Sequence, residues 1–154
     1  MEILMAVALT GLVFVGAVAM FGDMRLKMQE HQLESAARHF MADCRMVQQG
    51  NMFTIPENNI DGEKILNHLL IFSGFDGDNY SIGAQISDIS AKHYYFQDMG
   101  CKGVYLSKMN DAIRFTTLGS VKEYAYIRMK HQDNDDLEIV LNLQPVTGRI
   151  EIEK

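Results

Sequence analysis

The chain has no charged residue between Ile3 and Gly22 and no proline before Pro56. A helix in water carries polar residues on its outer face, so a long uncharged stretch must lie in lipid or in an equally apolar core. The lack of proline removes the residue that most strongly ends a helix. About 20 helical residues span roughly 30 Å, which matches the hydrocarbon thickness of a bilayer.

The sequence motifs of common enzymes and metal sites are also missing. The histidines and cysteines form no His-x-x-x-His or Cys-x-x-Cys spacing, and there is no Gly-x-Ser-x-Gly, phosphate-binding loop or dinucleotide fingerprint. Asp76-Gly77-Asp78 begins like a calcium loop but lacks the downstream bidentate Glu, which favours an ordinary polar turn. We therefore predict no catalytic residue, no metal, no cofactor and no enzymatic activity.

Basic residues are in the minority. The chain has 14 Lys and Arg against 20 Asp and Glu, a formal net charge of −6, and most of the excess acid lies beyond residue 50. Nucleic acids and anionic membranes bind clustered Lys and Arg. We therefore predict that the part of the chain beyond residue 50 binds neither.

Three interpretations of the segment 3–22 compete. A cleaved signal peptide needs a basic start, an apolar region of roughly 7 to 15 residues and a small-x-small cleavage site, which Ala17-Val18-Ala19 would supply. The lack of a preceding basic residue, the length of the segment and the helical pattern beyond it disfavour this interpretation. A plain membrane anchor explains the length but not Glu2, because acids at the end of apolar spans are costly and tend to be functional or paired.

The third interpretation rests on residues 2–13, EILMAVALTGLV, which resemble the N-terminus of type IV pilins and pilin-like subunits. Mature chains of that family open with a few small or apolar residues, then Glu-Leu-Met or Glu-Ile-Leu, then a long apolar helix. The acid of the family is the fifth mature residue, whereas here it is the second, so we expect three residues and a basic leader upstream of Met1. A weaker similarity to the family lies in residues 145–149, PVTGR, which precede a final predicted strand.

The resemblance implies a structural subunit that waits in the bacterial inner membrane with its head outside. The pilus assembly machinery would then polymerise it into a helical homo-oligomer, in an extracellular pilus or a periplasmic pseudopilus. Major pilin, minor pilin and secretion pseudopilin share these features. The alternative is a monomeric membrane-anchored binding or sensor domain, with residues 73–100 as the ligand surface.

Met1 and Glu2 are the assembly residues that the resemblance implies. An unpaired carboxylate in an apolar medium is costly, so Glu2 should find a positive partner or take up a proton. The family supplies a partner, the N-terminal amine of the same or a neighbouring subunit, which is often N-methylated. The alternative is that Glu2 only marks the membrane–water interface.

The charges around the span oppose this topology. Arg25 and Lys27 follow the span, and no basic residue precedes it. The positive-inside rule would then place the head in the cytoplasm. A removed basic leader would reverse the balance, so the presence or absence of a short leader with Lys or Arg upstream of Met1 tests the resemblance.

A single helix is predicted from about Ile3 to Gln49, with Gly50 as its stop. Its second half carries one apolar stripe at alternating steps of four and three, formed by Leu33, Ala37, Phe40, Cys44 and Val47. Two pairs have an acid four residues before a base, Asp23 with Lys27 and Glu34 with Arg38, as is typical of the solvent-exposed face of a helix. The predicted stem is therefore residues 1–50, and the head is residues 51–154.

Three glycines interrupt the apolar half of this helix: Gly11, Gly16 and Gly22. Glycine inside a helix costs about 1 kcal/mol relative to alanine. In lipid, glycines permit close approach of helices. In a filament they are also points where the helix could stretch or melt, and the sequence leaves both uses open.

The head is predicted to be a connecting region followed by an antiparallel sheet, which makes the fold class α+β. We expect a short helix from Glu63 to Phe72, then a loop region over 73–100 with one short strand or helical turn near 92–96. The sheet should begin at about residue 103, where apolar residues alternate with polar ones. Turns are expected at 132–136 and 145–148.

The two cysteines allow two states. Cys44 lies on the predicted buried stripe and Cys101 lies where the loop region meets the sheet, so a disulfide would link the stem to the head. Such a bond persists in an exported, oxidising context, and a loop of this size would contribute roughly 4 kcal/mol. The alternative is two buried free thiols.

Overall fold

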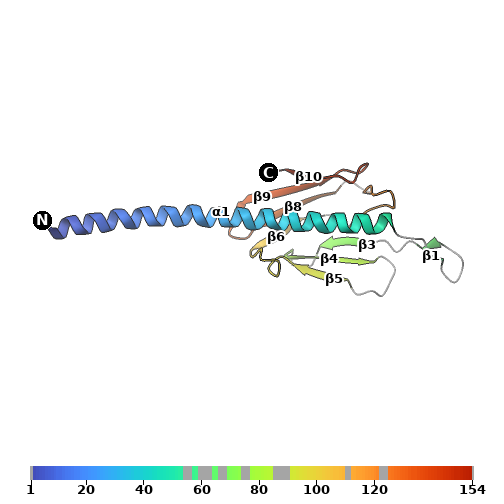
Figure 1. Cartoon of the computed structure of the whole chain (residues 1–154), viewed down its shortest axis with the longest axis horizontal. Helices are drawn as coiled ribbons and strands as arrows, with labels where there is room; N and C mark the ends of the chain where they lie inside the picture. The colour runs from blue at the N-terminus through green and yellow to red at the C-terminus, as the bar shows by residue number, and fades with distance from the viewer. Residues whose placement is uncertain are drawn as a thin grey trace. The chain divides into compact units, whose positions relative to one another are not determined.

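Helix α1 (Glu2–Met52) forms the N-terminal third of the chain in the computed structural model, and ten strands follow it within the described residues (Figure 1). The structure describes residues 2–53, 57–58, 64–65, 69–73, 77–84, 91–109, 112–121 and 125–153. In chain order the strands are β1 (Glu57–Asn58), β2 (Lys64–Ile65), β3 (Leu69–Ser73), β4 (Asn79–Ala84), β5 (Lys92–Tyr95), β6 (Val104–Lys108), β7 (Ile113–Arg114), β8 (Ala125–His131), β9 (Asn134–Leu143) and β10 (Ile150–Glu153). The predicted α+β class is confirmed.

The chain divides into two compact units, Met1–His31 and Gln32–Lys154. The first unit is helical wherever it is described. The second unit contains residues 32–52 of α1 together with all the strands. The sequence placed the division between stem and head at residue 50, whereas the division into units lies inside α1, because residues 32–52 pack with the strands.

Two four-stranded antiparallel sheets form the body of the second unit. One has the strand order β10-β9-β8-β6 and the other β5-β4-β3-β7, and β1 pairs with β2 in a separate ribbon. Strand β8 pairs with β9 from Ala125–Leu143 to His131–Asn134, with a register shift next to His131. Residues 32–52 of α1 lie beside strands of both larger sheets (Figure 1).

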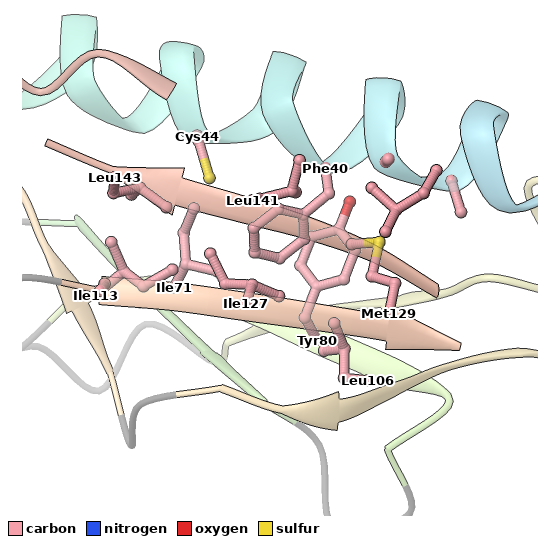
Figure 2. Packing of buried hydrophobic residues seen from close by; sticks show 14 of the residues in the cluster. Phe40, Cys44, Ile71, Tyr80, Leu106, Ile113, Ile127, Met129, Leu141 and Leu143 are labelled. Atoms are coloured by element: carbon pink, nitrogen blue, oxygen red, sulfur yellow. The ribbon is translucent and has the colours of Figure 1, made fainter. Parts of the chain in front are cut away.

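The core of the second unit lies between the helix and the sheets. Phe40 and Cys44 point from α1 toward the side chains of β8 and β9, among them Leu141 and Leu143 (Figure 2). The predicted helical stripe is confirmed, since all of its members are buried: Leu33, Ala37, Phe40, Cys44 and Val47. The predicted alternation is confirmed on β8 and β9, where the buried residues are Ala125, Ile127, Met129, Ile139, Leu141 and Leu143.

The C-terminal end of α1 lies beyond the predicted stop. Gly50 stays helical, and the helix ends at Met52. Two side-chain amides of the last turns donate to loop carbonyls: Gln48 Nε2 to Gly119 O (2.6 Å) and Asn51 Nδ2 to Phe115 O (3.1 Å). These tertiary bonds hold the last turn in place, which a local stop signal cannot anticipate.

The predicted helix over 63–72 is wrong. Where this segment is described, it forms β2 and β3, and β3 pairs with β4 on one side and with β7 on the other. A short continuous apolar run is typical of a buried central strand as well as of a helix, and periodicity alone does not separate them. The sheet structure therefore begins well before residue 103.

Strand β4 lies within the predicted loop region 73–100 and was not predicted. Of the short strand or helical turn expected near 92–96, the structure shows the strand, β5. Asn79 and Ser81 are buried in β4 beside Tyr80 and Ile82. Buried polar residues on a central strand hide the alternation on which strand prediction depends.

The predicted turns near the C-terminus are partly confirmed. The turn at 145–148 is confirmed, and Gly148 has the positive φ (63°) that favours glycine. The turn predicted over 132–136 is shorter, because β9 already begins at Asn134. On the edge strand β10, Ile152 is exposed although the pattern placed it on the inner face with Ile150.

Candidate assembly surface

The apolar half of α1 in the first unit is covered by exposed hydrophobic side chains. The large ones between Ile3 and Phe21 are Ile3, Met5, Val7, Leu9, Leu12, Val13, Phe14, Val15, Val18, Met20 and Phe21. Successive residues of a helix point in directions about 100° apart, so this set includes every face and not one stripe. A helix that is apolar all round needs an apolar environment on all sides.

This segment belongs to the one helix of the described chain that is long and apolar enough, by length and composition, to cross a membrane. The Thr10 hydroxyl donates a hydrogen bond to the Ala6 carbonyl one turn earlier, so its polar group is satisfied inside the helix. These features support association with a membrane through residues 3–22, as an anchor or as a signal sequence.

The glycines of this segment have open space around them. A Cβ built on Gly11, Gly16 or Gly22 would meet no atom within 4 Å. The described chain therefore gives no steric reason for glycine at these positions. Small residues on a helix surface allow another backbone to approach closely, and the open space is compatible with this use as well as with the stretching or melting of the helix.

The two predicted assembly residues at the N-terminus are only partly described. Glu2 is the first residue of α1. Met1 and the side chain of Glu2 lie outside the described residues. The pairing of Glu2 with an N-terminal amine thus stays a prediction.

An aromatic cluster fixes the second half of α1 to the sheet β5-β4-β3-β7. Tyr80 of β4 packs edge-on against Phe40 of α1, with ring centroids 4.8 Å apart, and its ring stacks on Tyr94 of β5 at 5.4 Å. The Tyr80 hydroxyl donates a hydrogen bond to the Asp43 carboxylate of α1. Burial, and then this bond to Asp43, raise the pKa of the Tyr80 hydroxyl above its ordinary value.

The two cysteines are free thiols, and both are buried. The predicted disulfide between Cys44 and Cys101 is not formed, and the alternative of two buried free thiols holds in this structure. Cys101 Sγ lies 3.7 Å from the Met99 carbonyl oxygen as a weak donor. Burial, and then the negative charge of Asp43, raise the pKa of the Cys44 thiol, which makes it unreactive.

Two histidines of the second unit have structural partners. His131, buried at the end of β8, lies between Gln32 of α1 and the next turn: Nε2 is 3.3 Å from Gln32 Oε1, and Nδ1 accepts from the Asp133 N–H. Ser81 Oγ lies 2.7 Å from His93 Nδ1, across the β4–β5 pair in which these two residues are register partners. Within the described ranges, no group of three or more His, Cys, Asp or Glu residues could hold a metal ion.

Sequence reasoning missed the cluster around Tyr80. Asp43 lies within the predicted helix and Tyr80 lies within the predicted loop region 73–100, so no pattern in the sequence joins them. The one available signal was that Asp43 precedes Cys44 next to the buried stripe, where a carboxylate requires a donor.

Comparison with protein-family models, with curated proteins and with solved structures finds no match.

Proposed function

We propose that the chain is a structural subunit of a type IV pilus-like filament, held in the bacterial inner membrane before it polymerises through residues 3–22. One observation carries the proposal: exposed apolar side chains include every face of this helical segment. A monomeric anchor needs the same hydrophobicity, but the open glycines on its surface favour contact with other helices.

The driving force for polymerisation would be packing and not the hydrophobic effect. Lipid tails are as apolar as Val and Leu side chains, so transfer of the segment from bilayer to filament gains little from the removal of water. Dispersion contacts grow as backbones approach each other. Gly11, Gly16 and Gly22 lower the separation at which two copies of the helix can meet.

Glu2 would set the axial register of the incoming subunit. An N-terminal amine beside the Glu2 carboxylate would offset the cost of burying this charge in an apolar filament. We expect Glu2→Gln and Glu2→Ala to leave the second unit folded and to impair assembly. Asp23→Asn is the matched control, because Asp23 is an exposed acid of the same helix that lies just beyond the apolar span. Normal filament yield from either Glu2 variant contradicts this role.

Electron microscopy of sheared surface material, with an antibody against the chain, tests the proposed function. Thin fibres labelled along their whole length identify a major pilin, and label confined to fibre ends or to periplasmic material identifies a minor pilin or a pseudopilin. If the native chain is recovered only as monomers in the membrane fraction, it is a membrane-anchored domain and the proposal is wrong.

A further inference from the structure

Three segments of the second unit form a surface without charge. They are residues 48–53, 116–120 and 144–148, with the sequences QQGNMF, TTLGS and QPVTG. None of these residues is Asp, Glu, Lys, Arg or His, in a chain of which 22% is Asp, Glu, Lys or Arg. We refer to the three segments together as the uncharged end surface.

Backbone and side-chain contacts join the three segments. Gln48 Nε2 donates to Gly119 O (2.6 Å), which ties the end of α1 to the middle segment. The N–H of Val121, the residue after the middle segment, donates to Pro145 O (3.1 Å) and so connects the middle segment with the third. Gly148 lies so close to Gly119 that a Cβ on it would collide with the Gly119 carbonyl oxygen. The surface is therefore preorganised, which lowers the entropic cost of binding a partner.

Large apolar side chains project from this surface. Phe53 is 82% exposed, Leu118 is 87% exposed and Val146 is 86% exposed, and Met52 is also exposed. Single exposed apolar residues are ordinary, but these four lie on segments that contact one another. A cluster of this kind, on segments that carry no charged residue, indicates a surface that another molecule covers. Arg149, which follows the third segment, pairs with Glu151 at 3.4 Å.

The charge of the chain narrows the choice of partner. Residues 32–154 contain 17 acidic and 12 basic residues, so two copies of this unit repel each other except where charge is absent. An anionic membrane surface is also disfavoured, because membrane-docking surfaces use Lys and Arg around the apolar residues. Among the described residues, the exposed segment 3–22 of α1 is a matching uncharged and apolar surface.

We propose that the uncharged end surface binds the apolar helical segment 3–22 of a second copy of the chain. The inference rests on the proposed function and adds a contact to it. The two surfaces that meet are different, so the contact is heterologous and can repeat from copy to copy. Repetition without closure yields a filament and not a dimer, and the end surface then sets the direction in which subunits add.

Photocrosslinking in native fibres tests the contact. Leu118 is replaced by benzoylphenylalanine in the full chain, and copies with and without nitrogen-15 are mixed so that crosslinks between copies are recognised by mass. We expect Leu118 to crosslink to a peptide within residues 3–28 of another copy. Crosslinks only to lipid, to a different protein, to another surface of a second copy or within one copy overturn the inference, as does the absence of any crosslink.

A charge placed on the end surface provides a second test. We expect Leu118→Asp to lower fibre yield at least about tenfold, because a carboxylate would be buried against an apolar helix, and Gln132→Asp to stay within about twofold. Gln132 is an exposed turn residue away from the end surface, and the fold of both variants is checked by circular dichroism. Normal yield from Leu118→Asp refutes this contact and leaves the proposed function intact. If the wild-type chain forms no fibres and no contacts between copies, both proposals fail.

Discussion

The two parts of helix α1 differ in how their apolar side chains are removed from water. Residues 33–47 carry a single apolar stripe, and the strands of the same chain bury it. Residues 3–21 carry apolar side chains on all faces, and the large ones that the structure describes are exposed. One part of the helix therefore finds its partner within the chain, whereas the other needs lipid or another molecule.

The width of the apolar surface indicates which part of the helix packs within its own chain. A stripe leaves room for a wet face, where Glu34 and Arg38 form an ion pair of 3.3 Å. A surface that is apolar all round leaves no such room. Changes on the stripe should therefore affect the stability of the second unit, whereas changes in segment 3–22 should affect assembly alone.

Two phenylalanines of α1 give the sharpest contrast between these parts. Phe40 is 0% exposed and Phe14 is 71% exposed. We expect Phe40→Ala to lower the free energy of unfolding by about 3–5 kcal/mol, because it leaves a cavity against Tyr80. Phe14→Ala should change it by less than about 0.5 kcal/mol. Urea unfolding of the full chain in detergent micelles measures both, and equal losses would remove the distinction between the parts.

The bond from Tyr80 to Asp43 should contribute an intermediate amount. Tyr80→Phe removes the hydrogen bond to a carboxylate and should lower the free energy of unfolding by about 1.5–3 kcal/mol at neutral pH. Its effect should also depend on pH. Because burial raises the folded-state pKa of Tyr80, the fold favours the protonated hydroxyl. The resulting stability is complete below the unfolded pKa of about 10 and is lost as the pH rises above it.

The alkaline loss of stability gives a second test of the buried Tyr80 hydroxyl. The difference between wild type and Tyr80→Phe should stay constant up to about pH 10 and shrink at higher pH. Unfolding measured from pH 7 to pH 11 provides the test. A difference that grows above pH 10 would mean that the hydroxyl is not held in its protonated form by the fold.

Two glycines give the smallest contrast. Gly148 has a positive φ and lies against the Gly119 carbonyl, so Gly148→Ala should lower the free energy of unfolding by at least about 1 kcal/mol. Gly16 lies in open space, and Gly16→Ala should leave the second unit unchanged while it lowers fibre yield, because the added methyl group separates packed helices. Unchanged fibre yield from Gly16→Ala would show that Gly16 is not needed for close packing between helices.

Much of the fold could be predicted because periodicity reports burial on one face. The helix, its stripe and strands β8 and β9 followed from patterns of three to four residues and of two residues. Strands β3 and β4 did not. Both strands have pairing partners on both sides. Strand β3 consists of an almost unbroken apolar run, and strand β4 buries Asn79 and Ser81, so neither strand shows alternation.

The candidate sites differ in the same way. The apolar segment is a local property, so the sequence located it together with its glycines. The Tyr80–Asp43 bond and the uncharged end surface join residues that lie far apart in the chain. No local sequence pattern predicts such contacts. The cysteines show the opposite error: the sequence suggested a disulfide between two distant elements, and both thiols are free in the structure.

Crosslinking through Val13 tests the central claim most directly. Both native cysteines are buried, so Val13→Cys adds the one readily oxidised thiol among the described residues, on an exposed position of the apolar segment. We predict that mild oxidation of assembled material yields disulfide-linked dimers, and that dilution in excess detergent before oxidation prevents them. If the Val13→Cys chain remains monomeric after oxidation in its native membrane and in surface material, the apolar segment contacts lipid and not another copy.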